Sequence, residues 1–168
     1  MDVVMNDLVL KISDRLNKWA EYLMIGLMAS ISLLIFTQVI FRYVFNYSLF
    51  WSEELGRYTL IWITFIGASV GFKKKGHVGV DFLYNTFSSQ VKDILTVFSD
   101  FVILTLALIL TIYGVNLSRF VHMQSSAALL IPMSIPYSAI AIGGFLTVFH
   151  SLSFLFEDIK RLKPGKRI

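Results

Sequence analysis

The stretch YLMIGLMASISLLIFTQVIF, residues 22–41, decides the fold class, because it carries no charge over twenty residues and one strongly polar side chain, Gln38. A helix of this length spans about 30 Å, which is the thickness of the hydrocarbon core of a bilayer. The rest of the chain has a similar character, since 56% of its 168 residues are hydrophobic and 15% are aromatic. This composition is typical of an integral membrane protein and not of a soluble domain.

Three later segments extend this interpretation to four transmembrane helices. The second apolar run, residues 58–72, is too short to cross a bilayer alone, so its helix must begin near residue 52 and include charged residues. We therefore expect an all-α integral membrane protein that forms one domain over residues 1–168. Its spans are predicted at about residues 20–44, 52–72, 94–115 and 135–157.

Two segments outside the spans predict short amphipathic helices at the membrane surface. Apolar residues recur at near-helical spacing in residues 7–19, with charged residues on the other faces, and these apolar residues are Leu8, Ile12, Leu16 and Trp19. This pattern is typical of a helix that lies on a leaflet. A shorter apolar stripe predicts a similar segment at about residues 80–92, with a plain loop as the alternative.

The distribution of basic residues predicts the orientation. Twelve of the fifteen Lys and Arg residues lie in the N-terminal flank, in the loop between the second and third spans, or in the C-terminal tail. The other three are Arg42, Arg57 and Arg119. By the positive-inside rule both termini should be cytoplasmic. The net charge of +4 then reflects membrane topology, and we expect no nucleic-acid partner.

Four charges flank the loop between the first two spans. Ser52 is a candidate helix cap, and it places Glu53 and Glu54 in the first helical turn, where the helix dipole favours negative charge. Arg57 follows at helical spacing from both acids, and Arg42 closes the preceding span. Because a lone guanidinium at the edge of the hydrocarbon core is costly, we expect these residues to form a neutral cluster.

Two other interpretations of this hairpin are possible. Each charge could reach water separately, with Trp51 and nearby tyrosines forming an ordinary aromatic belt. A catalytic role for Glu53 and Glu54 would need a nucleophile, a set of metal ligands or a phosphate-binding glycine loop, and none accompanies them. We therefore expect no catalytic, metal or cofactor site, and a protein that is not an enzyme.

Small residues in two spans predict close contacts between helices. The second span contains Gly67 and Gly71 four residues apart, and the fourth contains Ala139 and Gly143 at the same spacing. Such pairs allow helix backbones to approach closely in membranes. They serve either packing within the four-helix unit or contact with a partner.

Two ionisable residues are expected inside the membrane. Asp100 in the third span and His150 in the fourth lie at a similar depth, because the two spans run antiparallel. We expect them to pair across the bundle or to contact a partner. A proton relay is the alternative, although one such pair makes no continuous path across a bilayer.

The stretch FRYVFNYSLFWSEELGRYTLIWITFIGASVGFKKKGHVGVD, residues 41–81, resembles the signature region of the DctQ-like family. These proteins are the small membrane subunits of tripartite ATP-independent periplasmic (TRAP) transporters. The positions that carry the resemblance are Phe41, Arg42, Tyr43, Trp51, Glu53, Glu54, Arg57, Gly67, Ala68, Gly71, Gly76, His77 and Asp81. The stretch IPMSIPYSAIAIGG, residues 131–144, also looks like the start of the family's fourth helix.

The resemblance implies a scaffold subunit in the bacterial inner membrane, among membrane lipids. In such transporters a periplasmic binding protein captures an organic acid, and a large membrane subunit carries it inward with sodium. The small subunit binds the large one and does not carry the substrate. Family substrates include dicarboxylates, keto acids and sialic acids such as N-acetylneuraminate, and the chain is similar to the sialic-acid branch.

Two functions of other classes compete with this one. A self-sufficient four-helix transporter of the drug-exporter type needs an acid in its first span, and residues 22–41 contain none. A membrane-anchored redox subunit with bis-histidine haem ligation needs two intramembrane histidines. Only His150 lies within a predicted span, whereas His77 and His122 fall in loops.

Overall fold

The computed structural model describes residues 2–75 and 89–162, and these residues form four helices. They are α1 (Asp2–Tyr43), α2 (Phe50–Lys75), α4 (Ser89–Phe120) and α5 (Ser134–Leu162). Each contains a segment that is long and apolar enough to cross a membrane: Leu10–Tyr43, Phe50–Lys74, Ile94–Phe120 and Ser134–Leu155. The described residues contain no strand beyond one isolated bridge between Ser125 and Pro132. The predicted all-α fold with four spans is confirmed.

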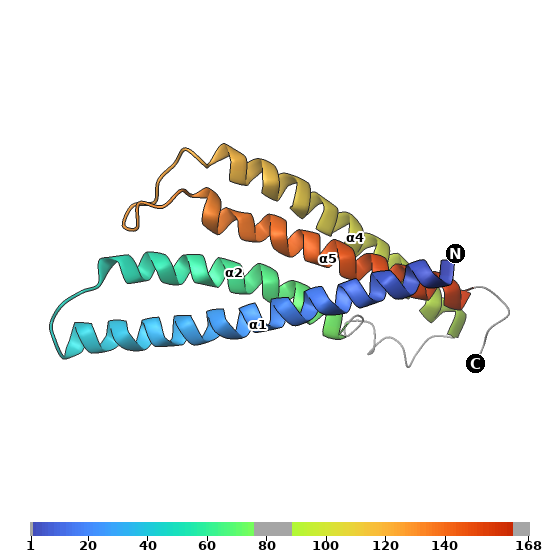
Figure 1. The fold of residues 1–168 in the computed structure, drawn as a ribbon, viewed down its shortest axis with the longest axis horizontal. Coiled ribbons are helices and arrows are strands. Elements are labelled where there is room, and N and C mark those ends of the chain that lie inside the picture. The colour runs from blue at the N-terminus through green and yellow to red at the C-terminus, as the bar shows by residue number, and fades with distance from the viewer. Residues whose placement is uncertain (1, 76–88, 163–168) are drawn as a thin grey trace.

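The helices form two antiparallel hairpins that lie side by side (Figure 1). One hairpin is α1 with α2, the other is α4 with α5, and α2 packs against α5. Helix α5 contacts all three other helices. The α1–α2 and α4–α5 connections lie at one end of this array, which we call the loop end (residues 42–58 and 118–134). The first residues of α1 and α4 and the last residues of α2 and α5 lie at the other, the terminal end (residues 10–24, 69–75, 94–100 and 146–155).

Helix α1 is much longer than one membrane crossing. It runs for 42 residues without interruption, so residues 7–19 begin the same helix that crosses the membrane. At the loop end it is closed by Asn46, whose φ of 52° is left-handed, while the Tyr47 amide donates to the Phe41 carbonyl at 3.0 Å. A residue in the left-handed conformation just after the last turn is a common way for a helix to end. The second predicted surface segment, residues 80–92, lies largely outside the described residues.

Glycines allow α5 to pack closely against α2 and α4. A Cβ atom on Gly143 would lie 2.6 Å from the carbonyl oxygen of Phe65 in α2, and one on Gly144 would lie 2.8 Å from Thr111 Oγ1 in α4. From the other side, a Cβ on Gly114 would lie 2.7 Å from the amide nitrogen of Ala141. Such approaches require the absence of a side chain, which explains why backbones in membrane bundles meet at small residues.

The small-residue pairs predicted from the sequence have different surroundings. Ala139 is fully buried and Gly143 is a closest-approach site. In α2, a Cβ on Gly67 would meet only the sulfur of Met24 at 3.2 Å, and one on Gly71 would meet nothing within 4 Å. The pair in α5 therefore packs inside the unit, whereas Gly71 faces open space.

Candidate functional site

Glu54 is the central residue of the loop end. Its side chain is buried, with 3% exposed, although it belongs to the first turns of α2. One carboxylate oxygen accepts the Tyr58 hydroxyl at 2.6 Å. The other accepts the backbone amides of Ala128 at 2.5 Å and Leu129 at 3.3 Å. A carboxylate that satisfies two backbone amides and a phenol holds these groups in one arrangement, because charge-assisted hydrogen bonds are the stronger ones.

The connection between α4 and α5, residues 121–133, folds as a compact hairpin over Glu54. The Ser126 amide donates to the Ile131 carbonyl at 2.9 Å, and the Met133 amide donates to the Gln124 carbonyl at 2.8 Å. Leu130 has a left-handed φ of 55° and exposes 74% of its side chain. The Glu54 carboxylate thus fixes a loop more than 70 residues away in sequence, and that loop presents an apolar side chain outward.

The other three members of the predicted charge cluster behave differently from Glu54. Arg42, Glu53 and Arg57 are exposed, and no ion pair joins any of the four residues to another. The neutral cluster is therefore not formed in this chain, because Glu54 is satisfied by backbone amides and the arginines reach outward. Arg42 lies in the last turn of α1, where a cation interacts favourably with the helix dipole.

The start of α2 shows how Ser52 and Trp51 lie. The helix begins at Phe50, and Ser52 Oγ donates to the Leu49 carbonyl at 2.6 Å, so Ser52 does not cap it as predicted. The Ser52 hydroxyl is buried within the first turn instead. Trp51 is half-buried, with no aromatic or polar contact within the described part of the chain.

At the terminal end, a group of buried polar residues joins α1, α4 and α5. Ser13 and His150 are both fully buried, and the Ser13 hydroxyl lies 2.7 Å from His150 Nδ1. Asp100 is also fully buried, and its backbone carbonyl accepts the Ser151 hydroxyl at 3.0 Å. The structure therefore brings Asp100 and His150 to the same junction, but the hydrogen bond of the His150 ring goes to Ser13.

Two ion pairs connect α1 with the end of α2 at the same level. Lys73 lies 3.1 Å from Asp14, and Lys74 lies 3.3 Å from Glu21. The Lys73 ammonium is also 5.1 Å from the centre of the Phe154 ring in α5. The charge compensation that the sequence predicted for the loop end is thus found at the terminal end.

The first part of α1 packs with a face that the sequence did not predict. Ser13, Asn17 and Ala20 are buried, and Leu16 packs against a core cluster that includes Ala20, Ile66, Val70 and Leu146. The expectation that Leu16 faces lipid is therefore wrong, because its side chain is used for helix packing. Ile12 and Trp19 are exposed, as a surface segment would require. Location on a leaflet remains a prediction.

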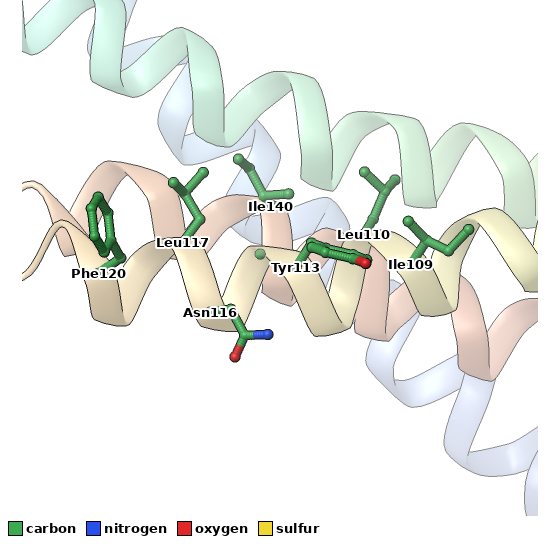
Figure 2. A pocket seen from close by; sticks show the side chains of 8 residues that line it. Ile109, Leu110, Tyr113, Asn116, Leu117, Phe120 and Ile140 are labelled. Atoms are coloured by element: carbon green, nitrogen blue, oxygen red, sulfur yellow. The ribbon is translucent and has the colours of Figure 1, made fainter.

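A groove of about 460 Å³ runs along α4 beside α5 (Figure 2). Its lining consists of Ile109, Leu110, Tyr113, Gly114, Asn116, Leu117, Phe120 and Ile140. In Figure 2 the Asn116 carboxamide points away from the side on which Leu117 and Ile140 lie. None of these residues is charged, so the groove offers no cation to pair with an organic acid.

Within the described ranges no three His, Asp or Glu side chains gather in a way that could hold a metal ion. The predicted site residues His77 and Asp81 lie outside the described residues. The sequence reasoning missed the loop residues Ala128 and Leu129, since backbone amides leave no signal in a sequence, and it missed Ser13. The spacing of Ser13, Asn17 and Ala20 along one helical face was a signal that could have indicated the packed side of α1.

The sequence of the chain is similar to proteins of one family. The family model described as "Tripartite ATP-independent periplasmic transporters, DctQ component" matches residues 31–161. A TRAP transporter small permease protein of Haemophilus influenzae is 33% identical over 137 residues, which cover 78% of this chain and 81% of the relative. The sialic acid TRAP transporter small permease protein SiaQ of Vibrio cholerae is 25% identical over 88% of this chain and 85% of its own length.

A third relative is much longer. The isethionate TRAP transporter permease protein DctMQ of Oleidesulfovibrio alaskensis is 27% identical over 147 residues. This similarity covers 83% of the present chain but 23% of the relative. Most of that permease therefore extends beyond the region that corresponds to the chain.

Proposed function

The chain belongs to the DctQ family of TRAP transporter components, and from this premise we propose that it is the scaffold subunit of a sodium-coupled importer of an organic acid. It is a multi-pass membrane protein, and its relatives are permease subunits and not enzymes. In this proposal the chain binds a large permease subunit, which carries the substrate. A periplasmic binding protein delivers that substrate.

The observation that carries the proposal is the similarity to a fused permease. Nearly the whole chain corresponds to less than a quarter of the isethionate permease protein. Two proteins that are joined in one relative and separate in another are expected to contact each other. The remaining length of the fused relative is the natural counterpart of a large partner subunit.

The surface of the chain supports the role of a scaffold. Organic acids carry negative charge, and a carrier must surround that charge with cations or hydrogen-bond donors in a cavity. The groove on α4 is lined by uncharged residues, and the cations at the loop end are exposed. Gly71 leaves open space on α2, which fits close approach by a partner helix.

The proposed orientation places the terminal end in the cytoplasm and the loop end in the periplasm. The basic residues Lys11, Arg15, Lys18, Lys73 and Lys74 lie at the terminal end, and Arg42, Arg57 and Arg119 lie at the loop end. This asymmetry satisfies the positive-inside rule. The loop that Glu54 holds would then face the periplasmic binding protein.

The loop-end residues that the sequence singled out receive distinct roles. Glu54 shapes the loop 121–133 from within, whereas the exposed side chains of Arg42, Glu53 and Arg57 are available for polar contacts with a partner. Trp51 is half-buried beside them. Removal of Glu53 or Arg57 is therefore expected to weaken assembly more than it changes substrate preference.

Co-purification tests the scaffold role. The tagged chain is expressed with a large TRAP permease subunit of the same organism and extracted in mild detergent, and the retained subunit is quantified. We expect a stable complex. We also expect substrate uptake only when vesicles contain both subunits, the binding protein and a sodium gradient.

Two results would contradict this assignment. Uptake by vesicles that contain the chain alone would show that it is a carrier. A chain that purifies without the co-expressed large subunit, while both proteins stay folded in the extract, would show that it is not a scaffold.

The substrate class stays broad. The relatives are named for sialic acid, isethionate and C4-dicarboxylates, which share an acidic group. We propose an organic acid, and the sialic-acid branch is the first to test, with N-acetylneuraminate offered to the assembled complex in competition with a dicarboxylate.

A further inference from the structure

One face of α1 at the terminal end carries basic and aromatic residues that point away from the bundle. Arg15, Lys18, Trp19 and Tyr22 recur at the spacing of a single helical face, and Lys11 continues it by one turn. Trp19 is 75% exposed and Tyr22 is 70% exposed. The buried residues Ser13, Asn17 and Ala20 occupy the opposite face, which packs against α2 and α5.

These side chains enclose a shallow pocket. It has a volume of about 240 Å³ and is lined by Arg15, Lys18, Trp19 and Tyr22. Two cations and two aromatic rings therefore line one open concavity on the surface of a membrane helix. A cationic group beside an indole ring is a combination suited to an anionic headgroup, because the ring has an apolar body and a polar N–H.

Asp14 and Glu21, the two acids among residues 10–24, do not belong to this face. Asp14 is paired with Lys73, and Glu21 is paired with Lys74. Within the described residues, Lys11, Arg15 and Lys18 form no ion pair. The helix thus separates its charges, with compensated pairs toward α2 and uncompensated cations outward, so the outward face attracts anions.

The position of the aromatic residues along α1 places this face at the membrane boundary. Tyr22 and Tyr43 are 21 residues apart in one continuous helix, which corresponds to about 32 Å and so to the thickness of the hydrocarbon core. Tyrosine and tryptophan prefer the headgroup level at both boundaries. Lys18, Arg15 and Lys11 then lie at and just beyond the headgroups.

From these observations we propose that the outward face of α1 is a binding site for an anionic phospholipid. Arg15 and Lys18 bind the headgroup phosphate, and Trp19 and Tyr22 contact the glycerol region and the start of the acyl chains. All four residues that line the pocket belong to this chain, so the chain alone can be tested for binding.

A phospholipid fits the face better than a soluble anion or an acidic protein surface. The pocket is formed by one helix and is open, so it offers a soluble anion no enclosure. Its aromatic half continues directly into the apolar surface of α1, where Leu23, Ile25 and Leu33 are exposed. Only a ligand that is anionic at one end and apolar at the other matches both halves.

Quenching of Trp19 fluorescence tests the proposal. The full-length chain is reconstituted in phosphatidylcholine vesicles that contain a minor share of brominated lipid, either brominated phosphatidylglycerol or brominated phosphatidylcholine. Because the chain has three tryptophans, the signal of Trp19 is the difference between the native chain and Trp19→Phe. We expect phosphatidylglycerol to associate with the site at least about fivefold more strongly than phosphatidylcholine.

Matched variants assign this preference to the two cations. Arg15→Gln with Lys18→Gln should lower the preference by at least about fivefold, since one basic residue near an anionic surface contributes about that factor. Arg42→Gln with Arg119→Gln removes the same charge from the loop end and should leave it unchanged. Arg15→Lys with Lys18→Arg preserves charge, should retain most of the preference, and reports that the fold tolerates exchange at both positions.

Several outcomes would overturn the assignment. Equal quenching of native Trp19 by both lipids would show that there is no anionic site, and an unchanged preference in the Gln variant would place the site elsewhere. Displacement by inorganic phosphate, but not by chloride at equal ionic strength, would assign the face to a soluble anion. Loss of Trp19 quenching by both lipids when the large permease subunit is bound would assign it to a protein interface.

Discussion

The two ends of the molecule handle charge in opposite ways. At the terminal end, acids and bases from α1 and α2 pair with one another, and the buried ring of His150 bonds to Ser13. At the loop end, the arginines are exposed and one acid, Glu54, is satisfied by backbone amides of a distant loop. At the terminal end, the ion pairs join α1 to α2, and exposed cations remain on the outward face of α1. At the loop end, Arg42, Glu53 and Arg57 are all exposed, and no ion pair joins them. This difference fits the proposal that ion pairs at the terminal end stabilise the unit and that the loop end contacts partner subunits.

The largest effect on stability is expected between the two ends, where Gly143 of α5 packs against Phe65 of α2. Gly143→Ala places a Cβ within 2.6 Å of the Phe65 carbonyl oxygen, so the backbones must separate. Overpacking of this kind costs about 3 kcal/mol. We expect a large decrease in the melting temperature of the detergent-solubilised chain. Gly71→Ala is the matched control, because a Cβ there meets nothing within 4 Å, and equal destabilisation by both would refute the packing described for α5.

At the loop end, replacement of Glu54 is expected to loosen the structure, whereas replacement of its neighbour Glu53 is not. Glu54→Ala leaves the amides of Ala128 and Leu129 and the Tyr58 hydroxyl without their acceptor, at a cost of about 2 kcal/mol. Glu53→Ala removes the same charge from an exposed position and should change stability by less than about 0.5 kcal/mol. The melting temperature checks both. Equal destabilisation by the two variants would exclude the anchoring role of Glu54.

The terminal end is tested through its buried hydrogen bond. Ser13→Ala leaves His150 Nδ1 without its partner and should destabilise the chain by about 1 kcal/mol, which is typical of polar contacts between membrane helices. Ser30→Ala in the same helix is the control, since its exposed hydroxyl bonds only to the Leu27 carbonyl. A protease-accessibility assay of the first residues of α1 distinguishes the two. Identical patterns for both variants would mean that Ser13 does not tie α1 to α5.

The sequence predicted the spans because membrane crossing is a local property: about 20 apolar residues in a row are sufficient. It could not distinguish Glu53 from Glu54, since their difference depends on a loop that folds back from residues 121–133. It misplaced Leu16 for a related reason. Lipid and protein interior are both apolar, so an apolar residue carries no information on which of them it contacts.

The predicted charge cluster is wrong for a similar reason, since the partners of a polar residue also depend on distant parts of the chain. Spacing along α2 correctly placed Glu53, Glu54 and Arg57 in the first turns of a membrane-spanning helix. Their partners were assigned by proximity in sequence, which favoured Arg42 across a short loop. The actual partners of Glu54 are backbone amides, which every residue carries, so no pattern of side chains could have indicated them.

The smallest effect is expected for the ion pair that distinguishes the terminal end. Lys73→Met with Asp14→Asn removes a pair in which Lys73 is 13% and Asp14 is 62% exposed, and such a pair contributes about 0.5 to 1 kcal/mol. In a double-mutant cycle on the melting temperature, the coupling should decrease as salt is raised, because screening weakens exposed pairs. The cycle between Arg57→Met and Glu53→Gln at the loop end should show no coupling at any salt concentration, since no ion pair joins these residues. Coupling there of the same size, with the same salt dependence, would show that the loop end also compensates its own charges, and the contrast between the two ends would then fail.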